Sequence, residues 1–412
     1  MVKNALYAQS GGVTAVINAT ACGVIETARK HPTQIGKLYA ARNGILGALN
    51  GDLIDTSYET DADIEALKYT PGGAFGSCRY KLKSLQEHEA EYRRLIEVFT
   101  AYNIGYFFYN GGGDSQDTAL KVAEISQILG YPLLTIGIPK TVDNDLPLTD
   151  NCPGFGSVAK YVAISVREAA LDVASMAATS TKVFILEVMG RHAGWIAAAG
   201  GLAGEKPEDP PHLILFPEIP LNEEQCLMKI KFCVENYGYC VIVVSEGVKN
   251  KQGQFLSEGN LKDAFGHAQL GGVAPVVASL VQEKLKYKYH YAIADYLQRS
   301  ARHIASLSDL EQAYALGKAA VEFALQGKNA ILPIIIRDQD LPYQWHICDA
   351  PLSQVANCEK KLPRDFITRE GFGITEKCRR YLLPLIQGEA YPPYHLGLPC
   401  YVKLQNKQAS KV

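Results

Sequence analysis

The feature that most constrains the fold is a series of short, uninterrupted apolar runs separated by longer amphipathic stretches. These runs do not alternate apolar with polar residues, and uninterrupted runs are typical of strands that are buried on both faces of a parallel sheet. Alternation of such strands with helices predicts doubly wound α/β sheets. The predicted strands are Ala5–Ala8, Gly105–Tyr109, Leu133–Ile138, Val183–Val188, Leu213–Phe216, Val241–Val244 and Ile331–Ile336.

Two of the intervening helices have recognisable start or stop residues. Asn222 with Gln225 has the pattern of a capping box, and Gly238 provides a stop for the helix between them. Ser308 with Glu311 repeats the pattern and predicts the start of a second helix. With 412 residues and 47% hydrophobic content, the chain exceeds one typical compact unit, so two lobes are expected.

Composition argues against several classes of protein. The formal net charge is -2, which does not indicate a surface for nucleic acid. None of the ten cysteines forms a C-x-x-C pair, so buried, reduced thiols are expected rather than disulfides. No uncharged apolar run approaches the ~18 residues of a membrane span, and the N-terminus lacks the apolar region of a signal peptide. We therefore expect a cytoplasmic protein with no nucleic-acid or membrane partner.

Glycine-rich loops follow two of the predicted strands. Gln9–Gly12 follows Ala5–Ala8, with a helix expected from about Val13, and Asn110–Ser115 follows Gly105–Tyr109. Ligands of open α/β sheets bind at the carboxyl ends of strands, and glycines let backbone N–H groups approach phosphate oxygens. One such loop is often only a tight turn, but two of them favour a phosphate site.

The chain has no convincing example of two other phosphate-binding motifs. The pattern G-x-x-x-x-G-K-[ST] is absent, which argues against a nucleotide-binding P-loop. Gly154–Ala159 imitates a dinucleotide fingerprint, but no predicted strand directly precedes it. A dinucleotide-dependent oxidoreductase is therefore disfavoured.

A dense polar cluster, Pro139–Asp145, follows the third predicted strand. Phosphoryl transfer to an alcohol needs a base for the hydroxyl proton and cations for the phosphoryl charge. Asp143 could be that base and Lys140 such a cation, while Thr141 and Asp145 could orient groups. The alternative interpretation is a solvated turn, because Asn and Asp favour turns.

Later strand ends also have polar residues. Met189–Trp195 follows the fourth predicted strand, and Arg191 there suits a phosphate or a sugar. Glu246 follows the sixth predicted strand and could cap a helix or accept from sugar hydroxyls. Arg299 could bind a phosphate or simply carry surface charge.

Together these segments resemble the phosphofructokinase family over nearly the whole chain. The resemblance is greatest to the bacterial pyrophosphate-dependent branch, and it implies two three-layer α/β/α lobes of the phosphofructokinase type with mostly parallel sheets. The motifs that carry it are Ser10–Gly12, Pro71–Arg79, Gly111–Ser115, Pro139–Asp145, Asn151–Tyr161, Met189–Arg191, Tyr296–Arg299 and Gly388–Tyr394.

In this family, the residues at two positions distinguish members that use ATP from members that use pyrophosphate. ATP-using members have glycine where Asp114 stands, and a carboxylate there would repel the nucleotide and fill its space. They commonly also have glycine where Lys140 stands, whereas an ammonium could contact a compact pyrophosphate and stabilise the transferring group. The pair indicates a pyrophosphate site.

The resemblance implies the roles of the site residues. Asp143, Lys140 and Asp114 are the expected catalytic residues, with Asp143 as the base for the 1-hydroxyl of fructose 6-phosphate. Pyrophosphate is expected to bind at Gly11, Gly12, Arg79, Asp114 and Lys140. The sugar phosphate is expected to bind at Thr141, Val142, Asp143, Lys182, Met189, Gly190, Arg191, Glu246, Tyr296 and Arg299.

The resemblance also implies the lobes and the assembly. Residues 1–157, with a returning segment near 300–355, are expected to bind pyrophosphate. Residues 158–299, with the tail 356–412, are expected to bind the sugar phosphate. A homodimer that catalyses reversible phosphoryl transfer is expected.

Two departures from the family pattern affect the site. The family usually has a magnesium-associated aspartate where this chain has Gly113, so Mg²⁺ is expected at Gly113 and Asp114 with few protein ligands. Lys182 replaces an arginine that reaches the sugar phosphate across the subunit interface, and near a second such position only Lys288 and His290 are present. A lysine binds phosphate without the bidentate geometry of arginine.

Several alternatives stay open at this stage. An ATP-dependent phosphofructokinase and a non-catalytic regulatory homologue both fit the general pattern, and Gly113 is the only feature that favours the second. Sedoheptulose 7-phosphate would need little more room than fructose 6-phosphate.

Overall fold

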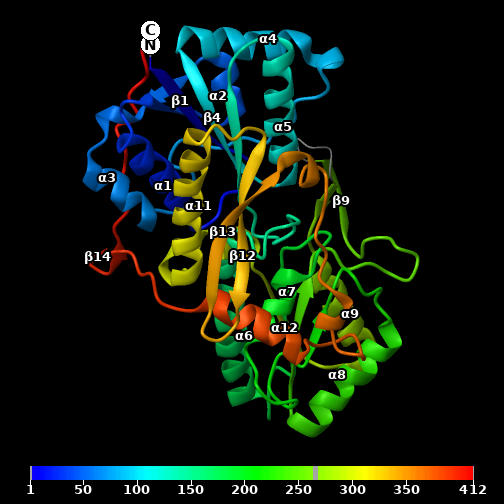
Figure 1. Cartoon of the computed structure of the whole chain (residues 1–412). Helices are drawn as coiled ribbons and strands as arrows, with labels where there is room; N and C mark the ends of the chain where they lie inside the picture. The colour runs from blue at the N-terminus through cyan, green and yellow to red at the C-terminus, as the bar shows by residue number, and fades with distance from the viewer. Residues whose placement is uncertain (1, 263–267, 412) are drawn as a thin grey trace. The chain divides into compact units, whose positions relative to one another are not determined.

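A computed structural model describes residues 2–262 and 268–411 (Figure 1). The chain divides into two compact units. Unit 1 comprises Met1–Gly154, Arg302–Glu359 and Gly388–Val412, and unit 2 comprises Phe155–Ala301 and Lys360–Gln387.

The division corrects one expectation, because the predicted tail 356–412 does not belong to one lobe. Residues 360–387 pack within unit 2, where the Trp195 Nε1–H donates to the Lys360 carbonyl at 3.0 Å. Residues 388–412 belong to unit 1, where the Ala409 N–H donates to the Leu53 carbonyl at 2.7 Å. Both attachments join distant segments through backbone carbonyl acceptors, and no local sequence pattern marks them.

Unit 1 contains a seven-stranded sheet in the order β13-β12-β5-β4-β1-β2-β3. The five interior strands pair in parallel, and β13 and β3 are antiparallel edge strands. The strands are β1 (Lys3–Gln9), β2 (Ile35–Ala41), β3 (Leu53–Asp55), β4 (Ile104–Gly111), β5 (Leu134–Pro139), β12 (Ile331–Gln339) and β13 (Gln344–Pro351).

Helices cover both faces of this sheet. Phe107 of β4 points into one core and Phe108 into the other, because successive side chains of a strand point to opposite faces. The Phe107 core includes residues of α2 (Ile45–Asn50), α4 (Leu85–Ala101) and α5 (Gly113–Ile128). The Phe108 core includes residues of α1 (Ile17–Arg29), α3 (Asp61–Ala66) and α11 (Leu307–Leu325).

Two glycines allow α1 and α11 to approach closely. A Cβ on Gly23 would lie 2.2 Å from the Tyr314 carbonyl oxygen, and a Cβ on Gly317 would lie 2.2 Å from the Thr20 carbonyl oxygen. Since both distances are far below van der Waals contact, any side chain at either position would force the helices apart. The pair holds the returning segment against the N-terminal part of unit 1.

Unit 2 contains a four-stranded parallel sheet in the order β11-β6-β8-β7. Its strands are β6 (Val183–Val188), β7 (Leu213–Leu215), β8 (Cys240–Ser245) and β11 (Tyr289–Ile293). Helices α8 (Glu223–Tyr237) and α9 (Val273–Leu285) share one core with the sheet. Helices α6 (Phe155–Met176) and α7 (Trp195–Gly200) also contact strands of this sheet.

The remaining elements are short. They are α10 (Asp295–Ser300), α12 (Glu376–Leu382), the hairpins β9 (Glu258–Lys262) with β10 (Ala268–Leu270) and β14 (Tyr394–His395) with β15 (Leu398–Pro399), and 3-10 helices at Thr56–Tyr58, Leu67–Tyr69, Arg302–Ile304, Leu352–Gln354, Arg364–Phe366 and Leu383–Ile386.

All seven predicted strands are present, and the predicted α/β class is confirmed. Asn222 caps α8 as predicted, because its side chain accepts from the Gln225 N–H and Gly238 ends the helix at φ 86°. The predicted start of the second helix was wrong. Ser306, not Ser308, accepts from the Asp309 N–H, so α11 begins two residues before the predicted start.

The helix expected from about Val13 also begins later than predicted. In the structure α1 starts at Ile17, after Thr14 and Ala15, which precede its first turn. The loop after β1 is therefore longer than the position of its glycines indicated.

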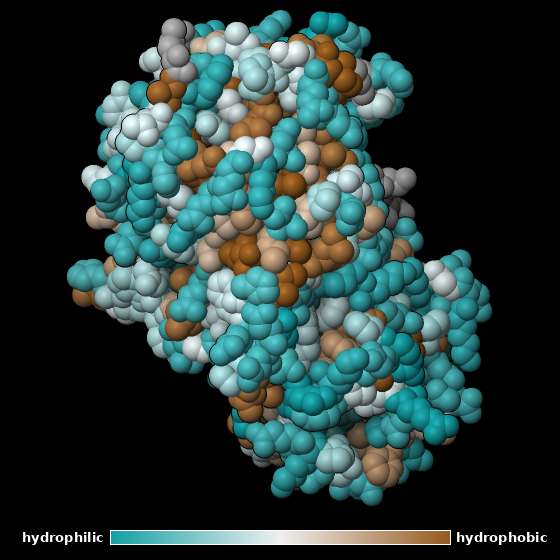
Figure 2. Space-filling model, viewed as in Figure 1, coloured by the Kyte–Doolittle hydropathy of each residue, from teal (hydrophilic) through white to brown (hydrophobic). Residues whose placement is uncertain are grey.

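Figure 2 shows the visible face covered mostly by hydrophilic residues, with smaller hydrophobic patches between them. Among the helices of the described residues, none has the length and apolar content that crossing a membrane requires.

Buried His212 should give the stability of unit 2 a pH dependence. Its Nδ1 accepts from the Val241 N–H at 2.9 Å, which assigns the proton of the neutral ring to Nε2. Burial is the largest influence on this ring, and it lowers the pKa of His212 to about 4. The unfolded chain has the ordinary value of about 6.5 and binds the extra proton between these pKa values. The free energy of unfolding should therefore be greatest above about pH 6.5 and fall by up to roughly 3 kcal/mol towards pH 4.

Denaturant unfolding at pH 7 and pH 5 measures this effect. His212→Asn is the matched variant, because an asparagine oxygen can still accept from Val241 but does not titrate. The variant should lose less stability between the two pH values than the unmodified protein does. An equal loss in both proteins would show that His212 is not responsible.

Candidate functional site

Three loops of unit 1 meet at the carboxyl ends of adjacent parallel strands. The loops follow β1, β4 and β5, and backbone hydrogen bonds join them. The Ser10 N–H donates to the Asn110 carbonyl at 2.9 Å, and the Lys140 N–H donates to the Gly111 carbonyl at 3.2 Å. The two glycine-rich loops and the polar cluster therefore form one surface.

The segment Pro71–Arg79 lies along the first of these loops. The Gly11 N–H donates to the Cys78 carbonyl at 2.9 Å, and the Ser77 hydroxyl donates to the Gly11 carbonyl at 2.7 Å. Gly11 has φ 75°, a left-handed conformation that glycine adopts without strain. These contacts fix the loop and bring Arg79, which follows Cys78, beside it.

Lys140 lies directly against the first glycine loop. Its side chain is buried, with 4% of the residue exposed. Its Nζ donates to the Gly12 carbonyl at 2.7 Å, and a Cβ on Gly11 would lie 3.4 Å from the same Nζ. A buried ammonium is thus held beside the glycine backbone, which is an arrangement suited to an anionic ligand.

Asp114 lies in the first turn of α5 and forms an ion pair with Lys81. The Lys81 Nζ donates to Asp114 Oδ1 at 2.7 Å. This hydrogen bond is the largest of the influences that raise the pKa of Lys81. Lys81 could not be predicted as a site residue from the sequence, because a single lysine two residues after Arg79 belongs to no recognised motif.

The loop after β5 is a rigid turn that presents Asp143. The Asp143 N–H donates to Thr141 Oγ1 at 3.1 Å. Asn144 is fully buried at φ 54°, and its side-chain oxygen accepts from the Cys152 N–H at 2.9 Å. Asn144 therefore has a structural role, while Asp143 beside it remains partly exposed.

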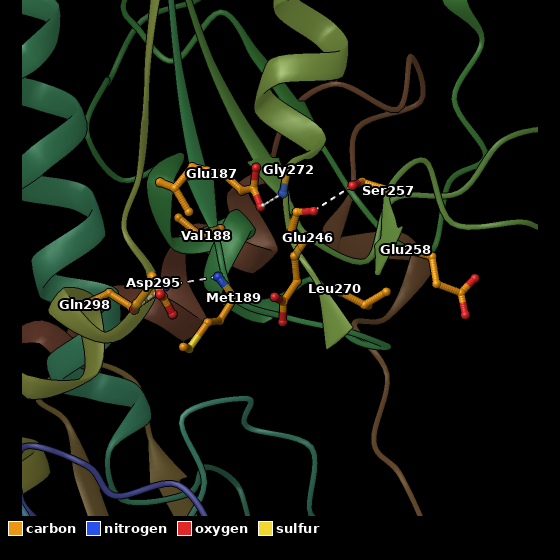
Figure 3. A pocket seen from close by; sticks show the side chains of 12 residues that line it. Glu187, Val188, Met189, Glu246, Ser257, Glu258, Leu270, Gly272, Asp295 and Gln298 are labelled. Atoms are coloured by element: carbon orange, nitrogen blue, oxygen red, sulfur yellow. Dashed lines mark hydrogen bonds between the residues drawn. The ribbon is translucent and has the colours of Figure 1, made fainter. Parts of the chain in front are cut away.

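Unit 2 contains a cavity of about 380 Å³ at the carboxyl ends of β6, β8 and β11 (Figure 3). Four carboxylates contribute to its wall. The lining residues are Glu187, Val188, Met189, Glu246, Ser257, Glu258, Leu270, Gly271, Gly272, Ile293, Asp295 and Gln298.

The loop after β6 is anchored on both sides of this cavity. The Met189 N–H donates to Gln298 Oε1 at 3.3 Å, and the Ser245 hydroxyl donates to the Gly190 carbonyl at 2.5 Å. Gly190 has φ 131°, and a Cβ there would lie 2.8 Å from the Ala193 carbonyl oxygen. The glycine is therefore required for the conformation that the loop adopts.

Two of the cavity carboxylates, the buried Glu187 and the partly buried Glu246, accept from backbone N–H groups. Glu246 accepts from the Gly190 N–H at 3.3 Å, and burial is the largest of the influences that raise the pKa of its carboxyl group. Glu187 accepts from the Gly272 and Ala274 N–H groups, both at 2.8 Å, and so caps the start of α9. Glu187 was missed, although a glutamate inside an apolar strand indicates a buried charge that needs partners.

Comparison with known protein families identifies the family that has these loops. The phosphofructokinase family model matches residues 4–324.

The chain belongs to the phosphofructokinase family.

Its relatives are similar over their full length. The pyrophosphate–fructose 6-phosphate 1-phosphotransferases of Methylococcus capsulatus and Halomonas elongata are 64% and 62% identical to it, and each match covers 99% of this chain and 97% of the relative. The crystal structure of a pyrophosphate-dependent phosphofructokinase from Marinobacter aquaeolei is 62% identical, with a TM-score of 0.92. That match covers 100% of this chain and 98% of the other. The predicted family is confirmed.

Some residues expected from the phosphofructokinase pattern do not line the unit 2 cavity. Arg299 stacks on Tyr296, with Cζ 3.9 Å from the ring centre, and both lie on α10 outside the lining set. Lys182 precedes β6, at the opposite end of the strand from Met189. Its Nζ donates to the carbonyls of Ala177 and Ala178 just beyond α6. The structure thus brings Met189 and Glu246 to the cavity but not Lys182.

Proposed function

We propose that the chain catalyses reversible phosphoryl transfer from inorganic pyrophosphate to the 1-hydroxyl of fructose 6-phosphate. The products are fructose 1,6-bisphosphate and phosphate. The observation that carries the proposal is the buried Lys140 ammonium, held 2.7 Å from the Gly12 carbonyl within the glycine loops of unit 1. The activity in the names of the full-length relatives supports it.

The proposal assigns the donor to unit 1. Gly11 and Gly12 would offer backbone N–H groups to pyrophosphate, and Arg79 would add a bidentate cation. Lys140 would neutralise charge that develops on the transferring group. Asp114 would occupy the space that a nucleotide needs.

Asp143 is assigned as the general base. Its turn holds the carboxylate at the end of β5, where Thr141 and Val142 would contact the same sugar. The base would take the proton of the 1-hydroxyl as the oxygen attacks the terminal phosphorus of pyrophosphate. The P–O bond to the leaving phosphate breaks in the same transfer.

The sugar phosphate is assigned to unit 2. Glu246 would accept from sugar hydroxyls and Met189 would shape the wall of the cavity, while Gly190 would hold the adjoining loop in place. Arg191, Tyr296 and Arg299 would bind the phosphate end. The carboxylates of the cavity support hydroxyl recognition, because ionised carboxylates accept hydrogen bonds.

The proposal includes a homodimer, which is the assembly expected from the resemblance. Edge strand β11 has exposed Tyr291 and Ile293, both 44% exposed. Lys182 and Lys288 lie at the same edge, where the Lys182 N–H donates to the Lys288 carbonyl at 2.9 Å. A second copy seated here would cover the apolar residues, and these lysines could reach its sugar phosphate.

Magnesium is proposed as the cofactor, since phosphoryl transfer generally recruits this ion. Across residues 2–262 and 268–411, no three His, Cys, Asp or Glu side chains form a group that could hold a metal. A Cβ on Gly113 would meet nothing within 4 Å, so this position leaves room beside Asp114. The residues present fit a Mg²⁺ held mainly by donor oxygens and waters. When bound, the ion would neutralise charge on the phosphoryl groups.

We predict that activity requires magnesium and that Asp114 contributes to its binding. Chelation should abolish turnover, and Asp114→Ala should raise the magnesium concentration that gives half-maximal activity. The measurement is a magnesium titration of both proteins at a fixed pyrophosphate concentration. Full activity after exhaustive chelation would contradict the requirement, and an unchanged half-maximal concentration would remove Asp114 from the surroundings of the ion.

The functional proposal is tested by crossing two phosphoryl donors with two sugar phosphates. Pyrophosphate should support turnover and ATP should not, at equal concentrations. Faster turnover with ATP would overturn the assignment in favour of an ATP-dependent phosphofructokinase. The same matrix ranks fructose 6-phosphate against sedoheptulose 7-phosphate.

A further inference from the structure

We propose that Lys81 determines donor specificity by compensating the charge of Asp114, so that Asp114 excludes ATP through its volume while pyrophosphate is still accepted. The inference rests on the proposed function and deepens it, because it adds a residue to the donor site of unit 1.

The ion pair between these residues is short and partly protected from water. The Lys81 Nζ lies 2.7 Å from Asp114 Oδ1, and the two side chains are 41% and 28% exposed. The pair joins the segment after Arg79 to the first turn of α5, directly beside the glycine loop. A charge at this position acts on any anion that the loop binds.

Packing and a hydrogen bond hold the backbone around Lys81 in place, which keeps the Lys81 ammonium close to Asp114. Tyr80 and Leu82, its two neighbours, pack against or into the core of unit 1. Lys81 between them is exposed, so its side chain points away from that core. The Lys121 Nζ of α5 donates to the Leu82 carbonyl at 3.1 Å, which ties the segment to α5 a second time.

Charge repulsion by Asp114 alone could not select the donor. Pyrophosphate is itself a polyanion, so an uncompensated carboxylate would repel it as well as ATP. With Lys81 paired to it, Asp114 keeps its volume but its net local charge is cancelled. Asp114 then excludes ATP, because its side chain fills space that the additional phosphate and the nucleoside of ATP need. The smaller pyrophosphate does not need this space and is still accepted.

Lys81→Met tests the compensation because methionine keeps the length of the side chain and removes the charge. The KM for pyrophosphate should rise roughly tenfold at saturating magnesium, as expected for one uncompensated charge near a polyanion. The KM for fructose 6-phosphate should change less than about twofold, because this charge lies in the donor site. Lys81→Arg should stay close to the unmodified protein, since the cation is retained.

A second variant separates charge from volume. Adding Asp114→Asn to Lys81→Met removes the uncompensated carboxylate but leaves a side chain of the same size. At saturating magnesium, the KM for pyrophosphate should fall from that of Lys81→Met towards the starting value, although kcat need not recover because Asp114 belongs to the proposed catalytic and magnesium site, and ATP should remain unused. Lys83→Met is the matched control, because Lys83 is a lysine of the same segment whose Nζ lies near Glu87 of α4, at 3.9 Å.

Two results for Lys81→Met would overturn the inference. An unchanged KM for pyrophosphate in Lys81→Met would do so, as would an equal rise in both KM values. Should Lys81→Met fail to fold, Asp114→Asn alone leaves Lys81 uncompensated and, at saturating magnesium, should lower the KM for pyrophosphate; a rise under that condition would contradict the inference. A protein that never uses pyrophosphate would instead refute the proposed function, so the two failures are distinguishable.

Discussion

Replacing Asp143 with asparagine is expected to lower turnover by roughly a hundred- to ten-thousand-fold, because the amide cannot accept the proton of the attacking hydroxyl. The substitution keeps the size of the side chain. It also leaves the backbone contact with Thr141 and the turn built by Asn144 in place. The effect should therefore appear in kcat, while the KM values for both substrates change little.

Steady-state kinetics of the purified variant measure this effect. Asp172→Asn is a suitable control, because Asp172 is exposed on α6 and the same chemical change there should leave kcat unaltered. Thermal unfolding of both variants verifies that they are folded. Near-normal turnover in a folded Asp143→Asn enzyme would remove Asp143 as the base.

Replacing Lys140 with methionine is expected to lower pyrophosphate-dependent turnover by about a hundredfold. The variant removes a buried cation that donates to the Gly12 carbonyl within the donor loops. Loss of one charge-assisted contact to a developing charge in a dry site costs roughly 3 kcal/mol in the transition state. Methionine fills most of the volume, so the loss should reflect charge rather than a cavity.

The same kinetic measurements identify the origin of the Lys140 effect. Lys318→Met, on the exposed face of α11, provides a control for removing a lysine charge from unit 1. A folded Lys140→Met enzyme with unchanged turnover would show that Lys140 does not act on the transferring group. Equal loss in the control would point to the overall charge instead.

Asp114→Gly combined with the loss of Lys140 extends this test to donor choice. Glycine at 114 opens the space that the carboxylate occupies, so ATP-dependent turnover should become detectable. The double variant should favour ATP more than either single variant, because neighbouring residues commonly couple non-additively. Efficient use of ATP is not expected, since an adenine pocket is a separate requirement.

The strands and the donor loops could be predicted because their sequence patterns are local. Uninterrupted apolar runs identified β4 and β6, and glycine or polar residues directly after the strands identified the loops. Parallel strands end at the same edge of a sheet, so the proximity of Gly12 and Lys140 also followed from the predicted topology.

Other parts of the site depend on contacts between distant residues. Lys81 meets Asp114 across 33 positions, and Glu187 caps α9 across 85 positions. Neither pairing has a periodicity or spacing that a single sequence reveals. The C-terminal tail was misassigned for the same reason, because its attachment to β3 uses backbone groups that every residue has.

Two features of the sheets could also not be predicted from the sequence. The edge strands β3 and β13 are antiparallel, and β13 alternates exposed with partly buried residues instead of forming an uninterrupted run. β11 is largely exposed, so its sequence lacks a buried pattern. Strand prediction from uninterrupted apolar runs therefore missed the edge strands β3, β11 and β13 and the interior strand β2, while it found the edge strand β7.

The chain passes between the two units four times, after Gly154, Ala301, Glu359 and Gln387. During synthesis, β6, β7, β8 and β11 all emerge before β12, which lies inside the sheet of unit 1. Unit 2 can therefore complete its sheet on the ribosome while unit 1 still lacks an interior strand. Truncation at residue 301 would leave β5 as an unprotected edge, a common origin of aggregation. Neither unit can be produced as a contiguous fragment, and circular permutation does not change this, because the segments of the two units still alternate when the ends of the chain are joined.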